Sequence, residues 1–439
     1  MHRLLYERLL LWKQNPHRKP LVLRGARQVG KTWLLKEFGT REYEKLVYVN
    51  CDRDAFAVDL FRDYDLRRIL LAVEAHSGIR VTPGDTLLVF DELQEVPRGI
   101  SALKYFCEEA PDIHVAVAGS LLGITLHKGT SYPVGKVDEL TLRPLDFREF
   151  LLGVGEESKA DLLAGGCWEA IDTLREEYTE LLRRYFYTGG MPAVVSAFAG
   201  ERGLAEVRRL QRDICRQYAE DISKHAPKNE IPRINMVWRS LVSQLARENR
   251  KFLYGALKKG GRAKEFETAI QWLVDAGIAN RVHRISKPCL PLKFYEDPAA
   301  FKLYPLDCGL MGAMADAPAE PVLTDNAGFE EYKGAFTEAY ALTEILSAVD
   351  SEPFYFAASD TTIEIDFLFQ LGETILPVEV KAGENLRSKS LRTFVANHPG
   401  LHGIRFSLSP YRQQDWLTNV PLYAIGAFLR HQTRRKAET

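Results

Sequence analysis

A glycine-containing loop between two apolar segments restricts the fold of this chain more than any other feature. Residues 25–32 are Gly-Ala-Arg-Gln-Val-Gly-Lys-Thr, which fits the pattern G-x-x-x-x-G-K-S/T in full. The loop follows an apolar run at 20–24 and precedes a helical pattern that begins near Thr32. A strand, a tight loop and a helix N-terminus in this order form a phosphate-binding site. The sequence therefore predicts an α/β fold with a nucleotide site after its first strand.

Further strands are predicted by short apolar segments at 46–50, 86–90, 113–118 and 137–142. Helical patterns separate most of these segments. Strands that alternate with helices favour a mostly parallel sheet with helices on both faces.

The segment Leu87–Glu92 is predicted to complete the nucleotide site, because four apolar residues there precede Asp91 and Glu92. We expect Lys31 to reach the β- and γ-phosphates, and Thr32 and Asp91 to hold Mg²⁺. Glu92 is placed to orient or deprotonate the attacking water, so hydrolysis is expected as well as binding. Ser120 follows the strand at 113–118 and is expected beside the γ-phosphate. The predicted nucleotide-binding residues are Gly25, Ala26, Arg27, Gln28, Val29, Gly30, Lys31, Thr32, Asp91 and Ser120.

Composition narrows the class of protein. The formal net charge is −1, from 58 Lys and Arg against 59 Asp and Glu, which excludes nucleic-acid binding through overall positive charge. A local basic face stays compatible with that balance. The six cysteines lack the spacing of a zinc site or redox dithiol. The N-terminus lacks a signal-peptide pattern, and no run approaches the roughly 20 apolar residues that span a bilayer. We expect a soluble, cytoplasmic protein without a membrane partner.

The middle of the chain has a helical pattern from about residue 159 to 226, broken at Gly189–Pro192. Three helical stretches within 234–276 and two strand-like ones at 278–285 and 290–296 resemble a winged helix. Its third helix, about 262–276, would take the recognition position. Basic side chains gather just before and at its start, namely Lys258, Lys259, Arg262 and Lys264. DNA contact and a packing role both remain open for this region.

A second charged constellation lies near the C-terminus, after a Pro- and Ala-rich stretch at 315–321 that indicates a linker. Apolar residues alternate from Ile363 to Lys381, on both sides of Leu-Gly-Glu, which predicts a β-hairpin. A turn at Gly372-Glu373 would place Asp366 nearly opposite Glu379, unless Pro377 shifts the register.

Two facing carboxylates need a positive partner, and a divalent metal with Lys381 would supply it. Glu338 lies on the apolar stripe of a predicted helix at 335–349 and also needs a partner, for which the same metal would serve. Oxygen ligands of this kind suit Mg²⁺ or Mn²⁺. The expected metal ligands are Asp366 and Glu379, with Lys381 and Glu338 completing the candidate catalytic set.

These residues resemble a known family, the bacterial and archaeal AAA-type ATPases that carry a C-terminal domain of unknown function. The resemblance rests on the segments 24–32, 89–97, 117–121, 132–150, 187–192, 301–310 and 364–383. It implies an AAA-type sheet and ATP rather than GTP. The sequence departs from the family pattern at Gly99, where a Trp is expected.

The C-terminal pattern, a helix with Glu338 followed by Asp366 and Glu379-x-Lys381, resembles the restriction-endonuclease-like nuclease fold. That resemblance implies that Asp366 and Glu379 bind the metal, and that Lys381 positions or activates water.

The predicted fold class is therefore α/β with four parts: an AAA-type ATPase at 1–158, a helical lid or linker at 159–230, a winged-helix-like part at 231–315 and a restriction-endonuclease-like part at 316–439. The predicted function couples ATP binding and hydrolysis to a nuclease-like part that acts on DNA or RNA. Two alternatives are an ATP-dependent switch with an inactive nuclease fold and an ATP-regulated DNA-binding protein. Homo-oligomers are common for such modules, and Arg143 and Arg148 are candidates for completing a neighbour's site.

Overall fold

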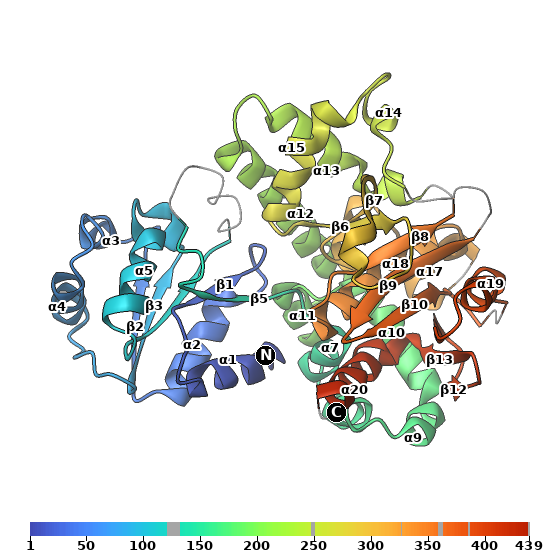
Figure 1. The fold of residues 1–439 in the computed structure, drawn as a ribbon, viewed down its shortest axis with the longest axis horizontal. Coiled ribbons are helices and arrows are strands. Elements are labelled where there is room, and N and C mark those ends of the chain that lie inside the picture. Colours follow the sequence, from blue (N-terminus) through green and yellow to red (C-terminus); the bar gives the residue numbers. More distant parts are fainter. Residues whose placement is uncertain (121–131, 247–250, 326, 359–362, 385–386, 438–439) are drawn as a thin grey trace. The chain divides into compact units, whose positions relative to one another are not determined.

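The computed structural model describes residues 1–120, 132–246, 251–325, 327–358, 363–384 and 387–437 (Figure 1). Leu121, the last residue of one family-like segment, lies outside the described residues. The chain divides into two compact units. The N-terminal unit comprises His2–Arg143 and Asp275–Ile278, and the C-terminal unit comprises Met1, Pro144–Val274 and Ala279–Thr439.

The N-terminal unit contains a parallel five-stranded sheet in the order β2-β3-β4-β1-β5. The strands are β1 Leu21–Arg24, β2 Lys45–Asn50, β3 Thr86–Asp91, β4 His114–Ala118 and β5 Asp138–Thr141. All five lie where the apolar segments predicted them. Every residue of β3 and β4 is buried, as in parallel strands with both faces covered.

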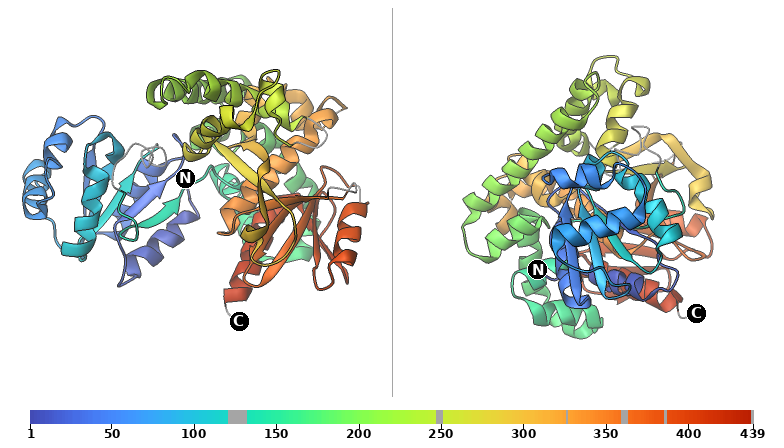
Figure 2. Two further views of the ribbon diagram at one scale, coloured as in Figure 1. Left: turned by 45° about the horizontal axis from the view of Figure 1, so that its top comes forward. Right: turned by 90° about the vertical axis from the view of Figure 1, so that its left-hand side faces the viewer.

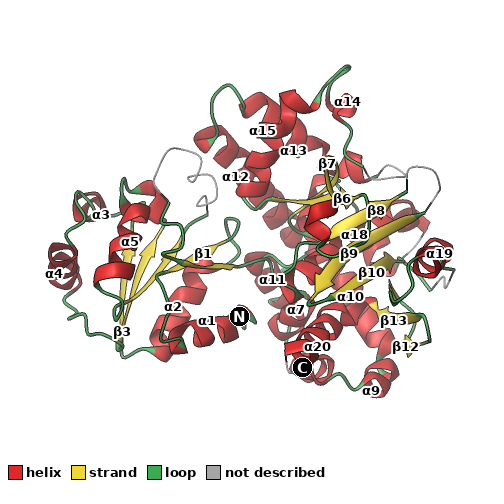
Figure 3. Ribbon diagram, viewed as in Figure 1, coloured by secondary structure: helices red, strands yellow, loops and turns green. Residues whose placement is uncertain are grey.

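Helices cover both faces of this sheet (Figure 3). They are α1 Leu5–Gln14, α2 Lys31–Glu42, α3 Ala55–Leu60, α4 Leu66–Ser77 and α5 Gly99–Glu109, with a short 3₁₀ helix at Leu93–Glu95. The helices α3, α4 and α5 share one apolar core with the strands, which includes Ile69, Phe90 and Phe106. At Gly99 a Cβ would meet the Leu93 side chain at 2.6 Å, so the expected Trp would need different packing there.

The C-terminal unit begins with helices. They are α7 Phe147–Gly153, α8 Glu157–Gly165, α9 Trp168–Thr173, α10 Arg175–Thr188, α11 Pro192–Ala199 and α12 Leu204–His225. The break predicted at Gly189–Pro192 separates α10 from α11. The backbone N–H of Gly190 donates to Asp307 Oδ2 at 2.6 Å, so a buried carboxylate satisfies the broken helix end.

Three helices follow, α13 Ile231–Leu245, α14 Tyr254–Leu257 and α15 Ala263–Asp275, in agreement with the three helical stretches. The remaining helices are α16 Cys308–Met314, α17 Ala319–Thr324, α18 Ala327–Ala348, α19 Lys389–Asn397 and α20 Ile425–Ala437, with 3₁₀ helices at Leu292–Tyr295 and Leu422–Ala424. The linker interpretation of 315–321 is wrong, because Ala317 is buried and α17 already begins within this stretch.

An eight-stranded mixed sheet forms the core of this unit, in the order β12-β13-β11-β10-β9-β8-β6-β7 (Figure 2). The strands are β6 Ala279–Ile285, β7 Glu296–Pro305, β8 Phe354–Ala357, β9 Glu364–Leu371, β10 Thr374–Val380, β11 Gly403–Ser407, β12 Arg412–Gln413 and β13 Leu417–Pro421. The prediction of a strand at 290–296 is wrong, because the strand β7, which pairs with β6, begins at Glu296. β6 also pairs with β8, so the strands expected to form a wing belong to the C-terminal sheet.

Candidate functional site

The glycine loop turns sharply between β1 and α2. Gly25 has a φ of 144°, and a Cβ there would overlap the carbonyl oxygen of Leu142. Gly30 has a φ of 95° and precedes the first residue of α2. Only glycine adopts these conformations at low cost, which explains both glycines of the motif.

Lys31 lies within this loop rather than in solvent. Its ammonium donates to the carbonyl oxygens of Gly25 at 2.9 Å and Ala26 at 2.8 Å. Burial lowers the pKa of Lys31 to about 8, although the negative charges of Glu92 and Asp91 oppose that shift. A desolvated ammonium held at a helix N-terminus is positioned to bind an anion.

The predicted Mg²⁺ ligands lie together at the carboxyl end of β3. The Thr32 hydroxyl donates to Asp91 Oδ2 at 2.7 Å, and the Tyr48 hydroxyl donates to the same oxygen at 2.8 Å. The other oxygen, Asp91 Oδ1, is buried and has no hydrogen-bond partner among the described residues. A buried carboxylate oxygen without a partner is costly unless a cation binds it. This pair therefore fits a divalent cation.

Glu92 and Ser120 also meet at this edge of the sheet. The Ser120 backbone N–H donates to Glu92 Oε2 at 3.2 Å, and its hydroxyl lies 3.3 Å from the same oxygen. The Gln94 amide also donates to Glu92. Sequence reasoning missed Tyr48 and Gln94. Tyr48 could have been predicted from its position on β2, because it lies two residues before the residue that pairs with Asp91 in the sheet.

The C-terminal hairpin has the register that the sequence predicted. Leu371 pairs with Thr374 across Gly372-Glu373, and the pairing continues to Phe367 opposite Val378. Asp366 and Glu379 are the next residues along the two strands. The Val380 N–H donates to Asp366 Oδ2 at 2.7 Å. Pro377 does not shift the pairing, since it lies opposite Leu368.

Glu379 is buried, and its two carboxylate oxygens differ in their contacts. Its Oε1 lies 2.9 Å from Lys381 Nζ, whereas its Oε2 is buried without a hydrogen-bond partner among the described residues. Arg405 lies beside it as the partner of Glu379 on β11. Burial lowers the pKa of Arg405, and the charge of Glu379 opposes that shift.

Glu338 has a protein partner that the sequence did not reveal. It is fully buried on α18, where Lys302 Nζ lies 3.1 Å away and the Tyr304 hydroxyl donates to it. Lys302 is itself buried and also lies 2.7 Å from Glu364 on β9. Lys302 therefore supplies the positive charge that a buried carboxylate on the apolar face of this helix requires.

Both candidate arginines interact with groups of their own chain. Burial lowers the pKa of Arg143 to about 10. The guanidinium of Arg148 donates to the carbonyl oxygen of Ala160 at 3.2 Å.

Three parts of the chain match known protein families. Residues 17–151 match the family described as AAA domain. Residues 179–320 and 333–425 match two families described as domains of unknown function, DUF8612 and DUF4143. Together with the parallel sheet and its glycine loop, the first match defines residues 17–151 as an AAA-type P-loop ATPase domain. Nucleotide binding, usually with Mg²⁺, is a property of that fold.

The solved structures to which the chain is similar include a Walker-type ATPase of Pyrococcus abyssi, which is 14% identical with a TM-score of 0.44 over 71% of this chain and 94% of that one. The Orc1 protein of Aeropyrum pernix, solved in complex with DNA, is 16% identical with a TM-score of 0.29 over 73% and 94%. The Holliday junction branch migration motor RuvB of Thermotoga maritima is 16% identical with a TM-score of 0.29 over 63% and 88%.

A search among curated proteins returned no match. Within the described residues, no helix combines the length and the apolar character that crossing a membrane requires.

Proposed function

We propose that the protein hydrolyses ATP in its N-terminal unit and uses the nucleotide state to control a metal-dependent site for DNA or RNA on the β9–β10 hairpin. The same observation supports this proposal at the ATP site and at the β9–β10 hairpin. Asp91 Oδ1 and Glu379 Oε2 are each a buried carboxylate oxygen without a hydrogen-bond partner among the described residues. The other oxygen of each carboxylate contacts a neighbouring polar group, since Asp91 Oδ2 accepts from Thr32 and Glu379 Oε1 lies 2.9 Å from Lys381 Nζ. A cation would satisfy each unpartnered oxygen.

At the ATP site, the loop residues 25–30 bind phosphate oxygens through their backbone N–H groups, and Lys31 contributes positive charge. Thr32 and Asp91 hold Mg²⁺, which supplies charge neutralisation to the β- and γ-phosphates when bound. Glu92 orients or deprotonates the attacking water, and Ser120 holds the Glu92 carboxylate. The Thr32 hydroxyl can bind the cation through a lone pair while its hydrogen still donates to Asp91.

At the hairpin, Asp366 and Glu379 would hold Mg²⁺ or Mn²⁺, which supplies a more acidic water and stabilises a leaving phosphate oxygen. Lys381, bonded to Glu379, positions the water. Glu338 supports this site indirectly. Lys302 forms ion pairs with both Glu338 and Glu364, and Glu364 lies two residues before Asp366 on β9. We retain a restriction-endonuclease-like fold for this part as a proposal.

The functional division that we propose remains 1–158, 159–230, 231–315 and 316–439. The last two parts share one sheet, so a movement of the helices at 231–275 would act directly on the strands that lead to the hairpin. Assembly into a homo-oligomer, with Arg143 or Arg148 facing a neighbour's nucleotide, belongs to the same proposal.

The test is cleavage of plasmid DNA, single-stranded DNA and RNA with Mg²⁺ or Mn²⁺, with and without ATP. The variants are Lys381→Ala and Glu92→Gln, and the control is Lys287→Ala, which removes an exposed lysine elsewhere in the C-terminal unit. We expect cleavage to be lost in Lys381→Ala, kept in Lys287→Ala and changed in its ATP response by Glu92→Gln. ATP hydrolysis without any cleavage would instead establish a switch with an inactive nuclease fold.

A second candidate function is regulated DNA binding by the segment around α14 and α15. Lys258, Lys259, Arg262 and Lys264 are all exposed there, and Glu265 is the acidic partner, 3.7 Å from Lys258. Reversing the charge of the three lysines should abolish duplex binding. Reversal of Lys287 is the matched control. Equal binding by both variants would rule out this surface.

A further inference from the structure

Three side chains with metal-binding atoms meet in the C-terminal unit, away from the hairpin carboxylates. His283 lies on β6, Glu296 begins β7, and Glu352 belongs to the loop before β8. One ligand atom from each lies within 4.8 Å of the other two. The three residues come from segments up to 69 positions apart (352 minus 283), so the fold rather than local sequence brings them together.

His283 is the least exposed of the three, with 9% of its surface accessible. Its ring packs edge-on against Phe301, with 6.0 Å between ring centroids. Its Nδ1 lies 2.9 Å from Glu296 Oε1 but makes no hydrogen bond of normal geometry among the described residues. A buried ring nitrogen that points at a carboxylate without a hydrogen bond indicates that the pair is arranged around something else.

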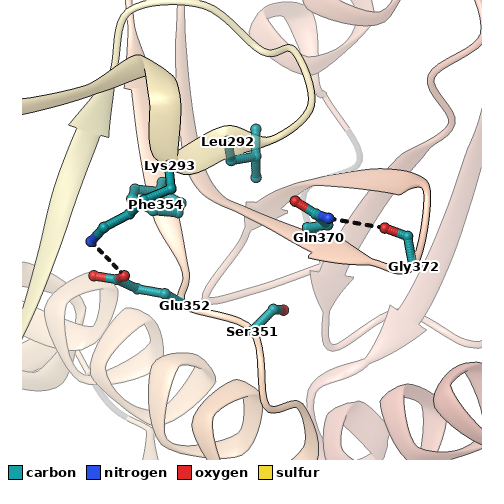
Figure 4. A pocket seen from close by; sticks show the side chains of 7 residues that line it. All are labelled: Leu292, Lys293, Ser351, Glu352, Phe354, Gln370 and Gly372. Carbon is teal, nitrogen blue, oxygen red and sulfur yellow. Dashed lines mark hydrogen bonds and ion pairs between the residues drawn. The ribbon is translucent and has the colours of Figure 1, made fainter.

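A lysine ammonium already lies between the two carboxylates. Lys293 Nζ is 2.7 Å from Glu296 Oε2 and 2.8 Å from Glu352 Oε2, and the second of these contacts is drawn in Figure 4. The Lys293 side chain is 63% exposed. The Lys293–Glu352 pair is exposed on both sides and such a pair contributes about 0–1 kcal/mol, so another cation can displace the ammonium from Glu352 at little cost.

We propose that His283, Glu296 and Glu352 bind a borderline divalent cation of the Zn²⁺ class in place of the Lys293 ammonium. One imidazole nitrogen and two carboxylates are ligands that Zn²⁺, Co²⁺ and Mn²⁺ accept, whereas Mg²⁺ and Ca²⁺ prefer oxygen alone. Ligand atoms at about 2.1 Å from a tetrahedral ion lie about 3.4 Å apart. The ligand atoms of the three residues lie within 4.8 Å of one another, so movements of roughly 1.4 Å at most, which the exposed Glu352 can make, would bring them to that spacing.

The surroundings leave room for the water that would complete the coordination. Lys293 and Glu352 also line a cavity of about 340 Å³, together with Ser351, Gln370 and Gly372 (Figure 4). A bound ion would fasten the start of β7 and the loop before β8 to β6, which lies between those two strands in the sheet. The site would act as a cross-link in the sheet and is separate from the carboxylates of the proposed nuclease site.

The experiment titrates Zn²⁺, and separately Co²⁺ with its visible absorption as the readout, into chelator-treated full-length protein without nucleotide. Excess Mg²⁺ occupies the oxygen-ligand sites first. The variants His283→Ala, Glu352→Gln and Lys293→Met are compared with wild type. The control is His402→Ala, because the His402 ring hydrogen-bonds to Thr418 and does not belong to this cluster. Glu352 is exposed, so Glu352→Gln tests the site even where loss of His283 impairs folding.

We expect one Zn²⁺ equivalent in wild type and in His402→Ala. Loss of a residue that only hydrogen-bonds to a metal ligand weakens metal sites by about 10- to 100-fold, so loss of the ligand itself in His283→Ala should weaken binding by at least about 100-fold. Lys293→Met should bind several times more tightly, because it removes the competing cation. Equal stoichiometry and affinity in His283→Ala, or weaker binding in Lys293→Met, would overturn the proposal and leave an ordinary ion-pair network.

Discussion

Replacement of Lys31 by methionine should stabilise the nucleotide-free protein while abolishing its response to ATP. Folding moves the pKa of Lys31 from 10.5 to about 8, mainly through burial. At about 1.4 kcal/mol per unit, that shift costs the folded state about 3 kcal/mol at neutral pH. Methionine removes this cost but leaves two carbonyl oxygens of the loop without their donor, at about 1 kcal/mol each.

The net gain is therefore about 1 kcal/mol, which corresponds to a rise of roughly 3 °C in the melting temperature of the N-terminal unit. Scanning calorimetry with and without ATP and Mg²⁺ measures it, since the transition that moves with ATP in wild type identifies this unit. Lys104→Met is the control, because Lys104 lies exposed on α5 of the same unit. We expect no stabilisation there and a normal response to ATP.

The pH dependence provides the sharper test. A lysine with a lowered pKa binds fewer protons in the folded than in the unfolded state between pH 8 and 10.5, so wild-type stability rises with pH across that window. Lys31→Met lacks this rise, and its advantage should shrink above pH 8 and then disappear. A lower melting temperature in nucleotide-free Lys31→Met at pH 7, or a constant difference up to pH 10, would refute the reasoning.

Three further expectations concern single contacts. Tyr48→Phe removes the hydroxyl that donates to Asp91 in the nucleotide-free protein, so urea denaturation should find the N-terminal unit about 1 kcal/mol less stable, and unchanged stability would contradict it. Gly25→Ala forces a Cβ onto a backbone carbonyl at positive φ, and should lower the stability of the N-terminal unit in urea by at least about 2 kcal/mol. Burial, and then the charge of Asp146, raise the pKa of Glu344 from 4.5 to about 8. Its folded form therefore keeps a proton that the unfolded form releases, and wild-type stability falls from pH 5 to 8. Melting curves of Glu344→Gln should show a smaller loss of stability between pH 5 and 8. An equal loss would contradict the raised pKa of Glu344.

Much of the nucleotide site was predictable because its determinants are local. The glycine loop, the apolar strand before it and the acidic end of β3 lie in short segments, and a parallel sheet places the carboxyl ends of its strands at one edge. The hairpin was predictable for a related reason. Its side chains alternate with a period of two, and a two-residue turn leaves one register that keeps the apolar residues buried.

The rest depended on contacts that local patterns do not encode. The strand Glu296–Pro305 starts with charged residues and contains Pro298, while the preceding segment contains apolar residues that mimic a strand. Among these, Phe294 is 83% exposed, so its apolar character carried no information about the sheet. The same error hid Lys302, the partner of Glu338, because the strand β7 and the helix α18 that carry them meet only in the folded protein.

The continuous sheet of the C-terminal unit joins two stretches of sequence that match two different families. The strands β6 and β7 lie in the region 179–320, and β8 to β13 lie in the region 333–425. Because β6 pairs with β8, each region made alone would present an open row of backbone N–H and C=O groups, the template on which chains aggregate. Gene fusions and truncations that separate the two regions should therefore be selected against, and they should travel through evolution as one unit.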